Sequence, residues 1–176
     1  MKKVLVLAGL AGMVAANAEA IDYTPYVGLD ANYGIVDTDT GSKISSKDWS
    51  LSAVLGGRTD RFGLEAFYNL GKEEDKGEVS TRLSSWGVDA LVFQDLGCSG
   101  RWELVGSAGL ADYKIKVHGS EGENYSDHGL AYRLGAGVQY AVSENTTFRA
   151  MYHHSWINGS HLDALGEFTV GVRYAF

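Results

Sequence analysis

The sequence predicts an all-β fold, an eight-stranded antiparallel up-and-down transmembrane β-barrel. Three observations predict it. Apolar and small or polar residues alternate through eight separate segments, and that period of two is typical of strands with one face in an apolar medium. Short and long connections alternate between the segments, and aromatic residues gather at the segment ends. Each segment has about ten residues, the length with which a tilted strand crosses the hydrocarbon core.

The first four segments keep one apolar face each. Their apolar sets are Val27, Leu29, Ala31, Tyr33 and Ile35; Trp49, Leu51, Ala53 and Leu55; Phe62, Leu64, Ala66, Tyr68 and Leu70; and Trp86, Val88, Ala90 and Val92. The residues between them are mostly glycine, serine and single charges. We therefore expect these sets to face lipid.

The last four segments continue the pattern. Their apolar sets are Trp102, Leu104, Gly106, Ala108 and Leu110; Leu130, Tyr132, Leu134, Ala136, Val138 and Tyr140; Phe148, Ala150 and Tyr152; and Phe168, Val170, Val172, Tyr174 and Phe176. The alternation is lost near Asp112 and Tyr113, which predicts a β-bulge there.

The opposite face predicts a narrow, filled lumen. A soluble sandwich would carry many Lys and Glu residues on its polar face, whereas the interior of an eight-stranded barrel is just filled by side chains. The charged positions on this face are Asp30, Arg61, Glu65, Asp89, Glu103, Arg133, Arg149, Glu167 and Arg173. We expect these five acids and four bases to pair; the alternative is a narrow porin-like channel through the same network.

The connections indicate the orientation. Residues 57–60, 94–100 and 142–145 are short turns, while 37–48, 71–81, 116–128 and 155–163 are longer and hydrophilic. Short periplasmic turns and long extracellular loops are the arrangement of outer-membrane barrels. The long set is therefore expected outside the cell.

Two aromatic girdles are predicted on the lipid face. The outer girdle comprises Trp49, Tyr68, Trp86, Tyr132 and Phe168. The periplasmic girdle comprises Phe62, Trp102, Tyr140, Phe148, Tyr174 and Phe176. Leu, Val and Ala fill the middle of the strands between them.

The N-terminus predicts export. A basic start, Lys2 and Lys3, precedes an apolar run and small residues that fit cleavage after Ala18 or Ala20. Residues 1–20 are interpreted as a signal peptide and 21–176 as one barrel domain. Cleavage after Ala18 removes both lysines and no acid, so the net charge falls from −7 to −9, which argues against a nucleic-acid partner. The single cysteine, Cys98, cannot form an internal disulfide.

Three stretches resemble a known group of proteins. Residues 130–140 (LAYRLGAGVQY), 148–152 (FRAMY) and 171–176 (GVRYAF) are similar to the OmpA-like, OmpX/Ail and Opa-type outer-membrane β-barrels. The resemblance implies a bacterial outer-membrane location and a non-enzymatic structural or surface role in envelope integrity, adhesion or antigenicity. It also implies that the barrel-assembly machinery reads Tyr174 and Phe176. No peptidoglycan-binding domain is expected.

One constellation favours an enzyme as the alternative. His153, Ser155 and Glu167 could form a Ser-His-Glu set, and their spacing resembles that of PagL-type lipid A deacylases. In that family the set faces lipid and an Asn follows the Ser. Here the phase sets His153 and Glu167 toward the lumen, and Trp156 follows Ser155.

The expected partners follow from this placement. They are outer-membrane lipid and lipopolysaccharide, the barrel-assembly machinery, and a host or envelope surface partner contacted through four outer loops. The protein is expected to be a monomer. No cofactor is implied, and no metal site is supported, because His118, His128 and His161 are divided between outer loops.

Overall fold

The computed structural model confirms the predicted closed barrel. It describes residues 23–37, 47–71, 74–76, 79–97, 100–119, 124–158 and 164–176. The strands are β1 (Thr24–Asp37), β2 (Lys47–Arg58), β3 (Phe62–Gly71), β4 (Glu74–Lys76), β5 (Val79–Leu96), β6 (Trp102–Gly119), β7 (Asn124–Ala141), β8 (Thr146–Asn158) and β9 (Ala164–Ala175). The predicted signal peptide and Cys98 lie outside the described residues.

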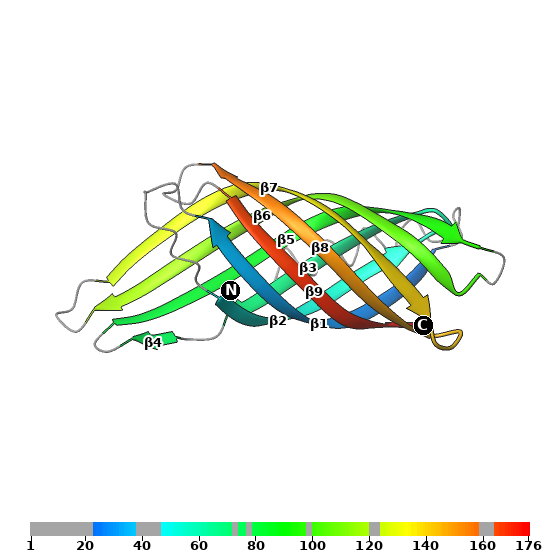
Figure 1. Ribbon diagram of the computed structural model, residues 1–176, viewed down its shortest axis with the longest axis horizontal. Helices are drawn as coiled ribbons and strands as arrows, with labels where there is room; N and C mark the ends of the chain where they lie inside the picture. Colours follow the sequence, from blue (N-terminus) through cyan, green and yellow to red (C-terminus); the bar gives the residue numbers. More distant parts are fainter. Residues whose placement is uncertain are drawn as a thin grey trace.

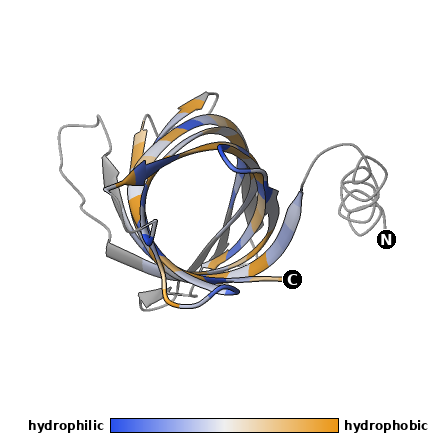
Figure 2. Ribbon diagram, turned by 90° about the vertical axis from the view of Figure 1, so that its right-hand side faces the viewer, coloured by the Kyte–Doolittle hydropathy of each residue, from blue (hydrophilic) through white to orange (hydrophobic). Residues whose placement is uncertain are grey.

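Eight of these strands form the barrel wall. Each pairs antiparallel with its neighbours, β1 pairs with β9, and the pairing of β3 with β5 completes the ring (Figures 1 and 2). The short β4 pairs with the outer end of β5 and takes no place in the ring. A closed ring leaves no unpaired edge within the hydrocarbon, where an unsatisfied backbone group would be costly.

The barrel is apolar on its outside. Leu29 and Leu51 are 66% and 67% exposed, while Asp30 and Ser52 beside them are buried. All eight wall strands alternate in this phase over the residues whose burial is described, and hydrophilic and hydrophobic colours alternate along the ribbons that face the viewer in Figure 2. In water such a surface would be unfavourable, whereas in a bilayer the exposed side chains contact lipid.

The predicted bulge at Asp112 and Tyr113 is wrong. Both residues continue the ladder, with Asp112 opposite Trp86 and Tyr113 opposite Ser85. Asp112 keeps the outward phase and accepts a hydrogen bond from Trp86 Nε1 at 3.1 Å, while Tyr113 is buried inside. The hydrogen bond from the Trp86 indole on the neighbouring strand thus stabilises the Asp112 carboxylate at a position where an apolar residue was expected.

The outer strand ends were predicted too short. The sequence assigned 116–128 to a loop, but β6 and β7 stay paired out to His118 and Asn124. β8 likewise continues through Asn158. Outside the hydrocarbon the strands no longer need an apolar face, so the period that marks them fades while the hydrogen-bonded ladder continues.

The turns at the other end are tight. At the β2–β3 turn, Thr59 donates its backbone N–H to the carbonyl of Phe62 at 2.8 Å. Gly97 and Gly100, in the β5–β6 turn, have φ of 78° and 62°, a left-handed conformation that favours glycine. Among the described residues no helix is both long and apolar enough to span a membrane.

Candidate functional site

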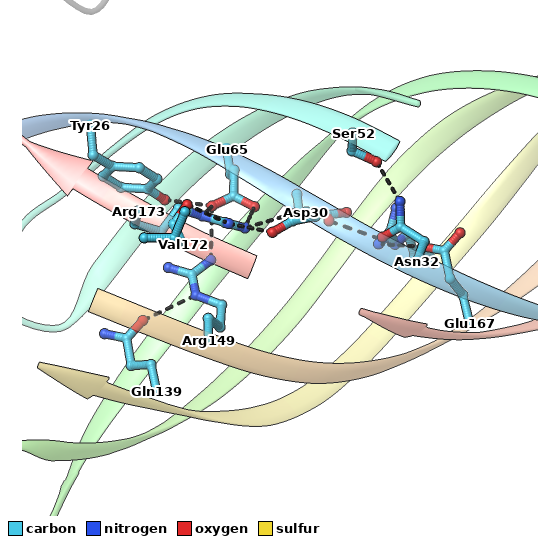
Figure 3. Close-up of polar contacts among 12 residues, drawn as sticks. Tyr26, Asp30, Asn32, Ser52, Glu65, Gln139, Arg149, Glu167, Val172 and Arg173 are labelled. Atoms are coloured by element: carbon cyan, nitrogen blue, oxygen red, sulfur yellow. Dashed lines mark hydrogen bonds and ion pairs between the residues drawn. The ribbon is translucent and has the colours of Figure 1, made fainter. Parts of the chain in front are cut away.

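Glu65 of β3 is the centre of the polar lumen (Figure 3). Its carboxylate accepts hydrogen bonds from Arg149 Nη1 at 2.8 Å, from Tyr26 Oη at 2.9 Å and from Arg173 Nη2 at 3.2 Å. These partners come from β8, which lies across the ring from β3, and from β1 and β9. Because the side chain is only 6% exposed, its charge is balanced by protein groups.

The two arginines extend this network. Arg173 forms a two-pronged ion pair with Asp30, in which Nη2 donates to Oδ2 at 3.0 Å and Nη1 donates to Oδ1. Arg149 Nε donates to Gln139 Oε1 at 3.0 Å. Two acids and two bases therefore neutralise one another in this layer, with the fork geometry that makes arginine–carboxylate pairs strong.

A second layer is centred on Arg133 of β7. Its Nη2 donates to Glu167 Oε1 at 3.3 Å, and its Nε lies 3.7 Å from Asp89 Oδ2. The guanidinium also lies 4.3 Å from the centre of the Phe67 ring, a favourable cation–π distance. Two acids share one base here.

A third layer, formed by the ion pair of Arg58 and Glu103, lies at the turn end of the lumen. Arg58 Nη2 donates to Glu103 Oε1 at 2.8 Å, and Glu103 also accepts from Gln139. The alternation predicts Arg61 in the lumen, whereas in the structure Arg61 is exposed. Arg58 is absent from the predicted lumen set because residues 57–60 are predicted to form a turn, although the inward alternation that passes through Ser52 and Val54 also reaches Arg58.

The other predicted lumen positions lie inside the barrel. Asp30, Glu65, Asp89, Arg133, Arg149, Glu167 and Arg173 are buried, and Glu103 is half-buried. Apolar side chains fill much of the remaining interior in two clusters, which contain Tyr26, Val54, Phe67, Ala111, Tyr113, Ala131, Ile157 and Leu165, and Leu91, Phe93, Val105 and Met151.

Lumen glycines make room for these large side chains. Gly28 lies opposite Arg173 in the ladder, and a Cβ there would meet Val172 O at 2.8 Å and Arg173 Nη1 at 2.9 Å. At Gly87 a Cβ would meet the Phe67 ring at 2.7 Å. Arg173 and Phe67 therefore take the space that the missing side chains of Gly28 and Gly87 leave on the neighbouring strands.

Little free volume remains. The described interior holds a polar cavity of about 10 Å³, lined by residues that include Asp89, Arg133 and His153, with room for roughly one water. Asp89 Oδ1, Arg133 Nε and His153 Nδ1 are buried there without a hydrogen-bond partner. One bridging water would suit these atoms, while a column of water would not fit.

The hydrolase candidates also lie inside. Glu167 is opposite His153 in the β8–β9 ladder, and both are buried. Ser155 is 1% exposed, and its hydroxyl shares a hydrogen bond of 3.1 Å with Tyr113 Oη. The outward neighbours of Ser155 are His154 and Trp156, whose rings pack edge to face at 4.5 Å. The three candidates are therefore separated from the lipid by the barrel wall.

The aromatic girdle residues are mostly exposed on the lipid side. Of the eleven predicted positions, Tyr140 alone is half-buried, stacked at 4.8 Å on Trp102. Tyr152, which packs at 4.8 Å on Phe168, and Trp156 add to the outer girdle. Within the described residues no group of three His, Cys, Asp or Glu side chains could hold a metal ion.

Comparisons with known proteins agree with this architecture. A family model described as "Outer membrane protein beta-barrel domain" matches residues 4–176. A search of curated proteins finds no match.

Solved structures show the same fold. Neisserial surface protein A is 23% identical with a TM-score of 0.73, covering 86% of this chain and 97% of that one. Ail of Yersinia pestis is 16% identical with a TM-score of 0.63, covering 88% and 97%. Outer membrane protein H of Pseudomonas aeruginosa is 20% identical with a TM-score of 0.62, covering 87% and 99%.

Proposed function

The chain belongs to the outer membrane protein beta-barrel domain family, and we propose that it is a non-enzymatic surface protein whose sealed barrel carries interacting loops. Its role is in envelope integrity, adhesion or surface antigenicity. The protein acts as a monomer in the bacterial outer membrane, and its outer loops contact a host or envelope partner.

The filled lumen carries this proposal. Three ion-pair layers, around Glu65, Arg133 and Glu103, cross the interior, and a cavity with room for about one water lies among them. A conducting pore would need a continuous aqueous path. The narrow-channel alternative is therefore the weaker one, since opening it would break several buried pairs.

The enzyme alternative is weaker still. A serine nucleophile needs an adjacent, oriented base and access to its substrate. Ser155 is hydrogen-bonded to Tyr113 inside the wall, whereas an acyl chain of the outer leaflet lies outside it.

Assembly fits the same proposal. Tyr174 and Phe176 are exposed, and their rings pack at 5.5 Å on the lipid side of the turn end. We place them as the signal read by the barrel-assembly machinery. Tyr174→Ala/Phe176→Ala should lower the amount of folded barrel in the membrane without changing the binding of the barrels that do assemble.

Loop exchange on intact cells tests the surface role. Residues 38–46, 72–78, 120–123 and 159–163 are each replaced by Gly-Ser linkers, and a turn at the opposite end, 142–145, is replaced as the matched control. Binding to epithelial cells, to immobilised heparin and to antibodies raised against the folded protein is measured. Heparin is included because a structure of Ail holds a heparin analogue.

The outer replacements should reduce binding of at least one ligand, and the turn replacement should reduce none. Binding that survives every outer replacement would refute a loop-borne surface role. Heat-dependent migration on a denaturing gel shows that each variant is folded.

A further inference from the structure

The ion pairs of the described lumen leave one acid in excess. The layer around Glu65 holds two acids and two bases, and the layer at the turn end holds one of each. The layer around Arg133, which we call the Arg133 layer, holds two acids, Asp89 and Glu167, and one base. Each of these three residues is at most 6% exposed, so bulk solvent does not screen the extra negative charge.

Asp89 is the acid of this layer with the poorer contacts. Glu167 accepts a hydrogen bond from Arg133 Nη2 at 3.3 Å. Asp89 Oδ2 instead lies 3.7 Å from Arg133 Nε, and neither this Nε nor Asp89 Oδ1 has a hydrogen-bond partner. On β6 the residue opposite Asp89 is Gly109, which offers no side-chain donor. An ionised Asp89 would therefore be a buried carboxylate with one oxygen left unsatisfied.

The strand register places a second carboxylate beside Asp89. In the β3–β5 ladder Asp89 lies directly opposite Glu65, and both side chains are buried on the inner face. Arg149 and Arg173 already bind Glu65 (Figure 3), and Arg173 also binds Asp30, so these two bases are balanced by two other acids. Carboxylates that share a site with too few bases are not all ionised, and a buried carboxylate without a counter-charge takes up a proton.

In the part of the lumen that the structure describes, no other group near Asp89 supplies the missing positive charge. The remaining titratable groups that face it are Tyr113 of β6 and His153 of β8, while β2 contributes the neutral Ser52 to the cavity wall. His153 forms no ion pair with a described residue, and its Nδ1 has no hydrogen-bond partner. A charged imidazole or a metal cation would also be repelled by the Arg133 guanidinium, which lines the same cavity.

We propose that Asp89 binds one proton in the folded barrel, at a pH where the aspartate of an unfolded chain is ionised. The proton leaves the Arg133 layer with one negative and one positive charge, on Glu167 and Arg133. It also makes the Asp89 carboxyl a hydrogen-bond donor toward the cavity of about 10 Å³, where one water can accept that bond. The site goes beyond the proposed function, because it does not depend on what the outer loops contact.

Proton binding at Asp89 links the stability of the barrel to pH. An unperturbed aspartate releases its proton near pH 3.9, so above about pH 4 unfolding of the barrel releases the bound proton. Up to the pH at which the folded barrel itself loses the proton, the folding equilibrium constant therefore falls up to about tenfold per pH unit from this site. Ion-paired carboxylates act in the opposite direction, because their contribution is lost as the pH falls.

Asp89→Asn tests the site, because the amide has the shape of the protonated acid and no charge. Folding equilibrium constants of the wild-type and variant barrels are measured by urea titration in lipid vesicles from pH 5 to pH 8. The ratio of the variant constant to the wild-type constant should rise at least about tenfold across this range. Histidine titration cancels in the ratio, because both proteins carry the same five histidines.

Glu103→Gln is the matched control. It makes the same acid-to-amide change inside the lumen, but in the neutral ion pair with Arg58 at the turn end. Removing a carboxylate that stays ionised changes the folding constant by the same factor at every pH. The ratio of this variant to wild type should therefore vary by less than about twofold between pH 5 and pH 8.

Infrared spectra of the wild type give a second measurement that does not require a variant to fold. At pH 6 an unperturbed aspartate is almost fully ionised. The folded barrel should nevertheless show the carbonyl stretch of a protonated carboxylic acid at this pH. The band should shift when aspartate alone carries carbon-13 and should stay in place when glutamate alone carries it.

Three outcomes would overturn the proposal. The first is a ratio of Asp89→Asn to wild type that stays constant from pH 5 to pH 8. The second is a folded wild type without the band of a protonated aspartate at pH 6, including the case in which the band follows labelled glutamate. In the third, sodium chloride stabilises the wild type at pH 6 more than choline chloride does, and Asp89→Asn abolishes the difference, so an alkali cation occupies the site.

Discussion

At the scale of single residues, the interior is governed by the cost of an unpaired buried charge. Glu65 receives hydrogen bonds from Tyr26, Arg149 and Arg173, so its removal takes one carboxylate acceptor away from each of two buried guanidiniums. Deleting one partner of a buried ion pair strongly lowers stability, because the other charge stays buried without a counter-charge. By contrast, the intact pair contributes little stability compared with a well-packed apolar replacement of both partners. The loss of stability on removing a charged side chain therefore depends on where in the lumen that side chain lies.

Glu65→Ala should lower the free energy of unfolding by about 3–5 kcal/mol, measured by denaturant titration in lipid vesicles. Glu103→Ala is the control, because its ion pair with Arg58 lies at the turn end and is partly exposed. It should cost about 1 kcal/mol or less. Equal losses in the two variants would contradict a lumen held by buried pairing.

Ser155→Ala should leave the lipids of the cell unchanged. The hydroxyl lies inside the wall with Tyr113, so it has no access to an ester in the outer leaflet. Mass spectrometry of lipid A should show that every acyl chain is retained, both in cells that overexpress the wild type and in cells that overexpress the variant. Loss of a chain that depends on Ser155 would establish the hydrolase instead.

At the scale of strands, glycine and a large side chain are matched across the ladder. Gly109 of β6 lies opposite Asp89, and a Cβ there would collide with Asp89 and the carbonyl of Val88. Gly106 on the same strand faces outward, where a Cβ would meet one methyl group of Val92 at 3.0 Å. The two glycines therefore lie on the same strand but on opposite faces of the barrel wall, Gly109 inside and Gly106 outside.

Gly109→Ala should therefore destabilise the barrel by about 1–3 kcal/mol through overpacking. Gly106→Ala should change the unfolding free energy by less than about 1 kcal/mol, because the Val92 side chain can move into lipid. Denaturant titration of both variants in vesicles is the measurement. The reverse order of effects would mean that the two faces are misassigned.

The phase of β7 gives a second prediction for a strand. Ala136 lies mid-strand on the lipid face, and Leu130 lies on the same face near the outer girdle. Ala136→Arg should cost about 2–4 kcal/mol, and Leu130→Arg about 0–1 kcal/mol. Unfolding of both variants in vesicles measures the depth dependence, and equal costs would place Ala136 away from the midplane.

At the scale of the whole molecule, the barrel has the opposite distribution of polarity to a soluble globular domain. Its outer surface is apolar and its core carries ion pairs and small apolar clusters. Contacts between the apolar outer surface and lipid take the place of the contacts that a soluble domain makes within its hydrophobic core. Stability therefore rests on the closed hydrogen-bonded ring and on a neutralised interior.

The wild-type protein in a planar bilayer should show no steady current. The three ion-pair layers and a cavity that holds about one water leave no continuous aqueous path. The preparation must first show heat-dependent migration on a denaturing gel, which confirms a closed barrel. A stable, reproducible conductance from such a preparation would favour the channel.

Local patterns alone determined the architecture of this chain. Period-two alternation revealed the eight wall strands, their phase and their antiparallel connection, because the side-chain face is fixed by residue parity within each strand. It also placed Glu65, Arg149 and Arg173 on the inner face. The alternation gave wrong predictions at two places. It missed the outer ends of β6 and β7, where the strands no longer need an apolar face. It also predicted a bulge at Asp112, where a hydrogen bond from the Trp86 indole offsets the polarity of the carboxylate.

Only the tertiary structure decided which groups meet. Glu65 pairs with residues 84 and 108 positions away, and that choice depends on strand stagger and tilt, which are set by closure of the ring. The same closure brings Arg58 rather than Arg61 to Glu103. The alternation along one strand fixes the face of each residue but not its height in the barrel, so the ion pairs and the filled lumen are determined only when all the strand registers are assembled.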